Sequence, residues 1–109
     1  MKFTLGGEMG CTGLEGYIKV PFSKVVEVLG EPQHTDGYKV AFEWNITFED
    51  GTVATIYDYK ESNLYDDGLP TPSELIEQEF SDWHIGGTSK KAVELISELF
   101  KGYEVEYGY

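Results

Sequence analysis

The chain contains no arginine, and this absence is the first constraint on what the protein binds. Its eight basic residues are all lysines, against twenty acids, which gives a formal net charge of −12. Arginine is the side chain that grips phosphate through paired hydrogen bonds, and a basic surface is what attracts nucleic acid and anionic lipid. The sequence therefore argues against direct nucleic-acid binding and against an anionic membrane surface as a partner.

Cysteine and long apolar runs are also scarce. Cys11 is the one cysteine among 109 residues, so the chain has neither a disulfide framework nor a cysteine-based zinc site. No apolar run approaches the roughly 20 residues of a membrane-spanning helix, and the first seven residues are too polar for a signal peptide. We expect one globular domain over residues 1–109, in the cytoplasm, with no cofactor and no metal.

Three segments are expected to be helices, at residues 21–30, 71–80 and 88–102. Pro21 opens the first at a position where a missing N–H costs nothing, and apolar residues then repeat at helical spacing. Thr71-Pro72-Ser73-Glu74 reads as a capping box. Thr88 or Ser89 caps the third helix.

The strongest local pattern is a hairpin over residues 40–60. Apolar and polar residues alternate on both sides of Asp50-Gly51, which reads as a two-residue type I′ turn. That turn pairs Trp44 with Tyr57 on the core face. Further strands are expected at residues 2–5, 16–20, 83–85 and 103–109. We expect an α+β fold: a mostly antiparallel β-sheet with a central Asp-Gly hairpin and two to three helices packed on one face.

The same register places Glu43 opposite Asp58, and like charges directly across a ladder repel one another. Two interpretations stay open. The carboxylates are solvated with Lys39 or Lys60 diagonally near, or the pair serves a cationic partner, a metal or proton chemistry. No third metal ligand has a suitable spacing.

Residues 49–82 form an acidic stretch that carries ten of the twenty acids and one lysine. Its field would attract a basic protein groove, and tyrosines interleaved with acids favour a protein interface over single-stranded nucleic acid. We expect these acids to converge in space, because the connection over residues 61–71 is short. The candidate partner contacts are Glu43, Asp58, Glu61, Asp66, Asp67, Glu74, Glu77 and Glu79.

A second candidate site is the glycine pair before the third helix. Such a turn exposes backbone N–H groups, and two lysines in the first helical turn oppose the helix dipole, so a bound anion would resolve the conflict. The alternative is an ordinary capped helix with solvated lysines. The site would comprise Trp83, His84, Gly86, Gly87, Thr88, Ser89, Lys90 and Lys91. No orienting acid or oxyanion hole accompanies Ser89 and His84, so we expect no enzyme activity.

Several segments together resemble a group of small, largely uncharacterised proteins of tailed bacteriophages. These segments are Gly37–Val40, Glu43-Trp44, Asp50–Lys60 and Trp83–Gly87. The resemblance implies a phage protein that acts inside a bacterial cell, and small accessory phage proteins often blunt host defences.

Three hypotheses about function follow. In the first, the protein binds and inhibits a basic host protein or ribonucleoprotein complex, such as a CRISPR effector, with its acidic face mimicking nucleic-acid charge. In the second, it is a sponge that sequesters a nucleotide immune signal at the Trp83–Lys91 turn. In the third, it is a structural or assembly protein of the virion. A homodimer is compatible with each.

Overall fold

The computed structural model describes residues 2–6, 12–32, 40–59, 61–62 and 64–108 of the chain. Lys39 and Lys60, expected beside the Glu43 carboxylate, lie outside the described residues. The described elements are β1 (Phe3–Leu5), β2 (Gly13–Lys19), α1 (Phe22–Leu29), β3 (Glu43–Phe48), β4 (Val53–Tyr57), α2 (Pro72–Glu77), β5 (Asp82–Gly87), α3 (Lys91–Leu99) and β6 (Glu104–Tyr107).

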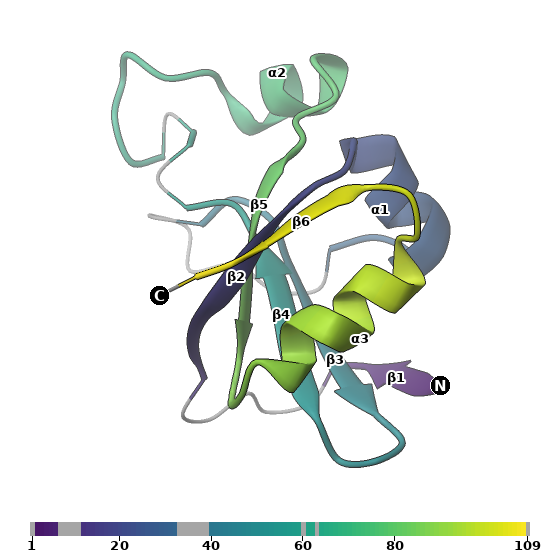
Figure 1. The fold of residues 1–109 in the computed structure, drawn as a ribbon. Helices are drawn as coiled ribbons and strands as arrows, with labels where there is room; N and C mark the ends of the chain where they lie inside the picture. The colour runs from purple at the N-terminus through teal and green to yellow at the C-terminus, as the bar shows by residue number, and fades with distance from the viewer. Residues whose placement is uncertain (1, 7–11, 33–39, 60, 63, 109) are drawn as a thin grey trace.

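The six strands form one sheet in the order β1-β3-β4-β5-β2-β6, and every neighbouring pair is antiparallel (Figure 1). The α+β fold is therefore confirmed. The hairpin strands β3 and β4 lie inside the sheet, and β4 and β5 are its two middle strands. The first and last strands form opposite edges, so the two ends of the chain lie far apart.

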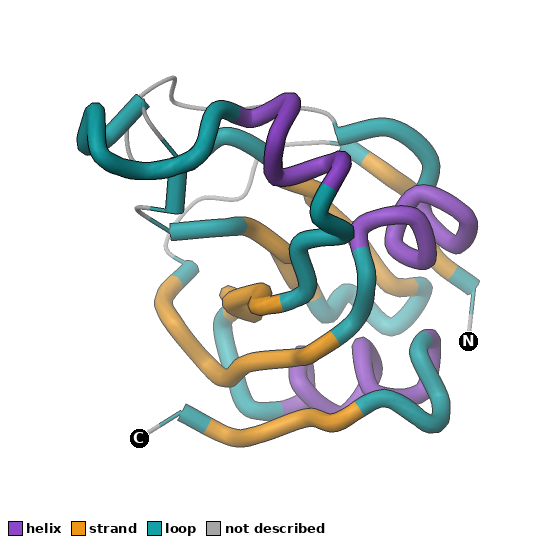
Figure 2. The backbone as a smooth tube through the Cα atoms, turned by 90° about the horizontal axis from the view of Figure 1, so that it is seen from above, coloured by secondary structure: helices purple, strands orange, loops and turns teal. Residues whose placement is uncertain are grey.

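The core lies between the sheet and the helices. Trp44 and Trp83 are buried there with their rings nearly perpendicular and their centroids 5.2 Å apart. The indole N–H of Trp44 donates to the carbonyl of Gly30 and that of Trp83 donates to the carbonyl of Val20, each at 2.8 Å. Both buried donors are therefore hydrogen-bonded. The predicted burial of Trp44 is confirmed. Each helix contributes to this core, and Figure 2 shows α3 running alongside β6.

Both predicted helix signals near proline are present. α1 begins at Phe22, so Pro21 is its N-cap rather than the first helical residue that the sequence predicted, and the helix ends at Leu29. The N–H of the C-cap residue Gly30 donates to the carbonyl of Val26 at 2.7 Å. In α2 the capping box is confirmed: the Thr71 hydroxyl accepts the Glu74 N–H, and the Glu74 carboxylate accepts the Thr71 N–H, both at 3.1 Å. α2 ends at Glu77, earlier than predicted. Among the described helices, none is both long and apolar enough to cross a bilayer.

The turn of the hairpin is one residue longer than predicted. The N–H of Phe48 donates to the carbonyl of Thr52 at 2.8 Å, which leaves three residues in the loop. Gly51 has a φ of +90°, whereas Asp50 has no positive φ. A type I′ turn needs positive φ at both central residues, while a three-residue loop needs it only at its last, where glycine is unstrained. The type I′ prediction is therefore wrong.

This extra residue shifts the pairing of β3 with β4 by one residue, so the side chains of β4 lie on the faces opposite to those predicted. Trp44 pairs with Ile56 and Glu43 pairs with Tyr57, so the predicted pairs Trp44–Tyr57 and Glu43–Asp58 are both wrong. Because side chains alternate along a strand, a one-residue shift moves every side chain of that strand to the other face. Ile56 is accordingly in the core, and Tyr57 faces away from the helices.

Candidate functional site

The predicted anion site at the glycine pair is wrong. Gly86 and Gly87 are the last residues of β5, and each pairs with β2 on one side and with β4 on the other. Glycine is needed at both positions because neighbouring atoms leave no room for a side chain. A Cβ on Gly87 would lie 2.6 Å from the Cβ of Ala92, and one on Gly86 would lie 2.4 Å from the hydroxyl of Thr55. The strand ladder therefore occupies the backbone that an anion would need.

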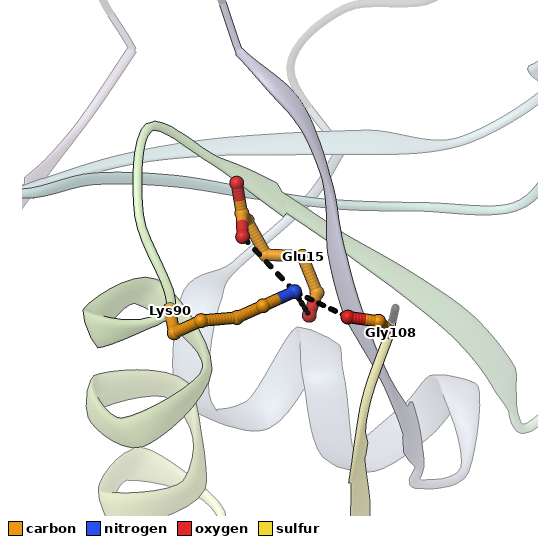
Figure 3. Close-up of polar contacts among 3 residues, drawn as sticks. All are labelled: Glu15, Lys90 and Gly108. Carbon is orange, nitrogen blue, oxygen red and sulfur yellow. Dashed lines mark hydrogen bonds and ion pairs between the residues drawn. The ribbon is translucent and has the colours of Figure 1, made fainter.

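The lysines of that segment are bound to acids of the protein. α3 begins at Lys91 with Lys90 as its N-cap, so the predicted start at Thr88 or Ser89 is also wrong. The Lys90 ammonium lies 3.2 Å from the Glu15 carboxylate and donates to the carbonyls of Glu15 and Gly108 (Figure 3). Lys90 thereby joins α3 to β2 and to the residue that follows β6.

Trp83 and His84 lie on opposite faces of β5. Trp83 is buried in the core, where its ring packs against Phe22, Trp44 and Phe80, so it does not wall a ligand pocket. His84 is half-buried on the other face, against which none of the described helices packs. Alternation along the strand therefore separates two side chains that the sequence placed in one site.

The face around His84 carries a row of five side chains, one from each of five neighbouring strands. Cross-strand pairing sets their order as Glu43, Tyr57, His84, Tyr17 and Glu106. Partners directly opposite in a ladder point to the same face. The row therefore places three aromatic rings in the middle and a carboxylate at each end. We call these three rings together with Tyr59 the ring cluster.

His84 is the centre of the ring cluster. Its ring centroid lies 5.0 Å from that of Tyr17, 5.4 Å from that of Tyr57 and 5.6 Å from that of Tyr59. The Tyr17 ring meets it edge-on, at 81°. Burial lowers the pKa of the His84 imidazole from its ordinary value, which favours the neutral form of the ring. Burial also raises the pKa of Tyr57, and the neighbouring Tyr59, Glu43 and Tyr17 add to that effect.

A hollow of about 170 Å³ lies beside the ring cluster, over β2, β5 and β6. We call it the acidic hollow. Its polar and aromatic lining consists of Tyr17, Lys19, Glu61, Asp82, His84, Glu104 and Glu106. Among the described residues, four carboxylates from three separate parts of the chain thus share this lining with one ammonium group. A second hollow of about 200 Å³ lies over β3 and β4, and Glu43, Tyr57 and Tyr59 line it.

The lysine in the acidic hollow does not balance these carboxylates. Lys19 pairs across the strands with Asp82 and with Glu104. Its ammonium lies 4.0 Å from the Glu104 carboxylate, and both side chains are about two-thirds exposed, so this ion pair is weak. Burial raises the pKa of the Glu61 carboxyl, and the nearby carboxylates of Asp82 and Asp58 raise it further.

Asp58 is not a surface contact, which corrects its prediction as a partner-binding residue. Its side chain is fully buried, and one carboxylate oxygen accepts the N–H groups of Ala41 at 2.9 Å and Phe42 at 2.7 Å. The corrected register explains this placement, because Asp58 falls on the core face of the hairpin. The carboxylate fixes the backbone that enters β3.

The other predicted contacts are spread over several elements. Glu43 and Glu61 are half-buried, Glu43 within the row and Glu61 at the acidic hollow. The remaining acids are exposed, and three of them accept hydrogen bonds from backbone N–H groups of the protein. The Asp66 carboxylate accepts the Gly68 N–H, Glu74 completes its capping box, and the Glu79 carboxylate accepts the Ser23 N–H. The exposed predicted acids are Asp66, Asp67, Glu74, Glu77 and Glu79.

Of the acidic stretch, Glu61 and Asp82 are the residues that line the acidic hollow. The polar and aromatic residues of this lining that were missed as site residues are Tyr17, Lys19, Asp82, Glu104 and Glu106. The alternation of acids along residues 103–107 was nevertheless visible in the sequence. That alternation shows which residues share a face. It does not show that β6 pairs with β2, which lies more than 80 residues earlier.

Within the described ranges, no group of three or more His, Cys, Asp or Glu side chains is placed to hold a metal ion. Comparisons with protein-family models, curated proteins and solved structures return no match to this chain. The resemblance to small phage proteins is therefore still a prediction, and the candidate site has to be interpreted from its own chemistry.

Proposed function

We propose that this protein is a binding protein that attaches to a basic protein partner through the face of the sheet that carries the ring cluster and the acidic hollow. The observation that carries the proposal is that Glu61, Asp82, Glu104 and Glu106 line one hollow with a single weakly paired lysine among the described residues, beside exposed aromatic rings. Tyrosines at the centre of a patch with charges at its rim are typical of protein interfaces.

The charge of the chain supports a basic partner. A net charge of −12 steers a positively charged surface toward the protein and repels nucleic acid. A partner that itself handles nucleic acid presents lysines and arginines in a groove. Carboxylates along this face would then occupy the positions that phosphates take. This is the charge mimicry that the sequence predicted, moved from the acidic stretch to the open face of the sheet.

The resemblance to tailed-phage proteins supports a host complex as the partner. Under this proposal the protein inhibits an antiviral complex in the bacterial cytoplasm by direct binding, and it performs no reaction of its own. His84 contacts aromatic rings, and we assign it no catalytic role.

The other two hypotheses receive less support. A nucleotide sponge at the Trp83–Lys91 turn requires free N–H groups and free lysines, and that segment is a paired strand followed by lysines bound to Glu15 and Asp50. A virion protein is compatible with the fold, but no feature of the described residues favours it.

The proposal is tested by capture of partners from a bacterial lysate with two matched charge-reversed baits. One bait carries Asp82→Lys, Glu104→Lys and Glu106→Lys. The control bait carries Glu77→Lys, Glu94→Lys and Glu98→Lys, three acids that are exposed and lie outside the acidic hollow. Both baits change the net charge equally, so only the position of the change differs.

We expect the wild-type and control baits to retain one basic host complex and the first variant to lose it. Binding should weaken about tenfold or more between low and physiological salt, because exposed charges are screened over about 8–10 Å. Capture that survives in the first variant, or that both variants lose equally, would overturn the assignment of the interface to this face.

A further inference from the structure

The acidic hollow has the size and lining of a site for one side chain. Its volume of about 170 Å³ is below the roughly 300–1,000 Å³ of pockets that enclose a drug-sized ligand. Tyr17 and His84 contribute adjacent aromatic rings to the lining, and the rest of the described lining consists of four carboxylates with Ile18 and Lys19. A nucleotide is too large for this space and has the wrong charge for it.

The charges around the hollow favour a cation. Glu61, Asp82, Glu104 and Glu106 all line it, and Lys19 is the one lysine among the described lining residues. The pKa of Glu61 is raised, first by burial and then by the neighbouring carboxylate of Asp82, so a negative charge on Glu61 is already disfavoured. A cation that enters would relieve this repulsion. Burial lowers the pKa of His84, which disfavours a positive charge on the ring at this site.

The aromatic wall favours a planar cation. A guanidinium group stacks on an aromatic ring and donates parallel hydrogen bonds to a carboxylate, whereas an ammonium group is a compact and strongly hydrated charge. Tyr17, 37% exposed, offers a ring to the hollow, and Glu106 lies directly across the ladder from it. Ring and carboxylate are thus presented together.

We infer that the acidic hollow is a socket for a single arginine side chain of the basic partner. This inference rests on the proposed function, and it adds the position and the chemical group of the central contact. Lys19 is the internal competitor in this arrangement. Its weak pair with Glu104 leaves it free to swing toward solvent when the guanidinium enters.

The socket is tested without any partner, by NMR titration of the protein with methylguanidinium, and with n-butylammonium as the comparison cation. We expect millimolar binding of methylguanidinium, chemical-shift changes centred on Tyr17, His84 and Glu106, and weaker binding of butylammonium. Tyr17→Leu, which keeps apolar bulk, should weaken binding about threefold by removing the ring.

The lysine variants give the sharpest control. Lys19→Gln should tighten methylguanidinium binding about twofold or more, because it removes the competing cation. Lys101→Gln makes the same change in net charge on an exposed residue outside the hollow, and should leave binding nearly unchanged. Asp82→Asn combined with Glu106→Gln should abolish the localised shift changes, whereas Glu94→Gln combined with Glu98→Gln should preserve them.

Shift changes scattered over the surface, or equal effects of Lys19→Gln and Lys101→Gln, would overturn the socket. The two proposals also fail separately. A host complex captured through this face by a protein that ignores methylguanidinium would refute the socket and keep the binding function. Localised methylguanidinium binding in a protein that captures no complex would support the socket and refute the function.

Discussion

The ammonium group of Lys91 lies 2.6 Å from the carboxylate of Asp50, which ties the first turn of α3 to the loop between β3 and β4. The hydrogen bond from Lys91, helped by the N–H of Thr52, lowers the pKa of Asp50 to about 2. Lys91→Gln should therefore raise the pKa of Asp50 toward 3.8. An NMR titration of the side-chain carboxyl carbon measures this shift, with Lys101→Gln as the control.

A lowered carboxyl pKa means that the folded state favours the charged form. The stabilisation from Asp50 is therefore complete above its ordinary pKa of 3.8 and is lost as the pH falls toward about 2. Between these pH values the wild-type protein should lose stability more steeply than Lys91→Gln does. Identical acid-unfolding curves would show that the ion pair does not form in solution.

Trp44→Ala should destabilise the protein by about 3–5 kcal/mol, because it removes a large and fully buried ring between α1 and the sheet. Urea unfolding monitored by circular dichroism measures the free energy. Leu14→Ala, at a side chain 45% exposed, is the control and should change stability by less than about 0.5 kcal/mol. A small loss for Trp44→Ala would mean that the ring is not in the core.

Asp58→Ala should be strongly destabilising although it removes an acid from an acidic protein. It leaves the N–H groups of Ala41 and Phe42 without the oxygen they donate to, at a cost of about 1–3 kcal/mol for each buried group. Asp58→Asn keeps one acceptor oxygen and should cost less. Glu77→Ala, which removes an exposed acid, serves as the reference. A stabilised Asp58→Ala protein would place this carboxylate on the surface, as the sequence suggested.

Gly87→Ala should cost about 1–3 kcal/mol of stability, because the new methyl group would press against Ala92 and the carbonyl of Val53. Gly13 pairs with Gly87 across the ladder, yet a Cβ at Gly13 meets nothing within 4 Å. Gly13→Ala is therefore the matched control and should be nearly neutral. Equal effects at the two positions would contradict the close packing of α3 on β5.

Glu61 should weaken the fold at neutral pH. Its raised pKa means that the folded state favours the protonated form, so this contribution to stability is present below the ordinary value of 4.5 and is lost as the pH rises through the folded value. Glu61→Gln should unfold at higher urea concentration than the wild type at pH 7, and the two should converge below about pH 4. A less stable variant at pH 7 would show that the charged carboxylate is favourably paired.

The sequence predicted the individual helices and strands better than it predicted the register in which the strands pair. Local signals such as the Thr71–Glu74 capping box and the alternation of residues 43–48 act within a few residues, and the structure has both. The predicted register of β3 and β4 was wrong because the sequence Asp50-Gly51 is compatible with both a two-residue and a three-residue hairpin loop. That choice depends on which faces of β4 the rest of the protein covers.

The prediction of an anion site at Gly86 and Gly87 was wrong for a similar reason. A glycine pair before a helix has the same sequence whether it forms an open turn or the close-packed end of a strand. The outcome was decided by β2 and β4, which flank Gly86 and Gly87, and by Ala92 above them. The acidic hollow is lined by residues from both ends of the chain, and no local sequence pattern predicts that these residues lie close together.

The position of β2 has a consequence for how the chain folds as it is synthesised. Its two neighbours in the sheet, β5 and β6, follow it by more than 60 residues. On the ribosome β2 therefore waits without a partner until β5 has emerged, and it lacks its second neighbour until residues 104–107 have emerged. Pairing at such separations is slow, about milliseconds to seconds. The excess of acids, which repels like chains from one another, protects the nascent protein during the same interval.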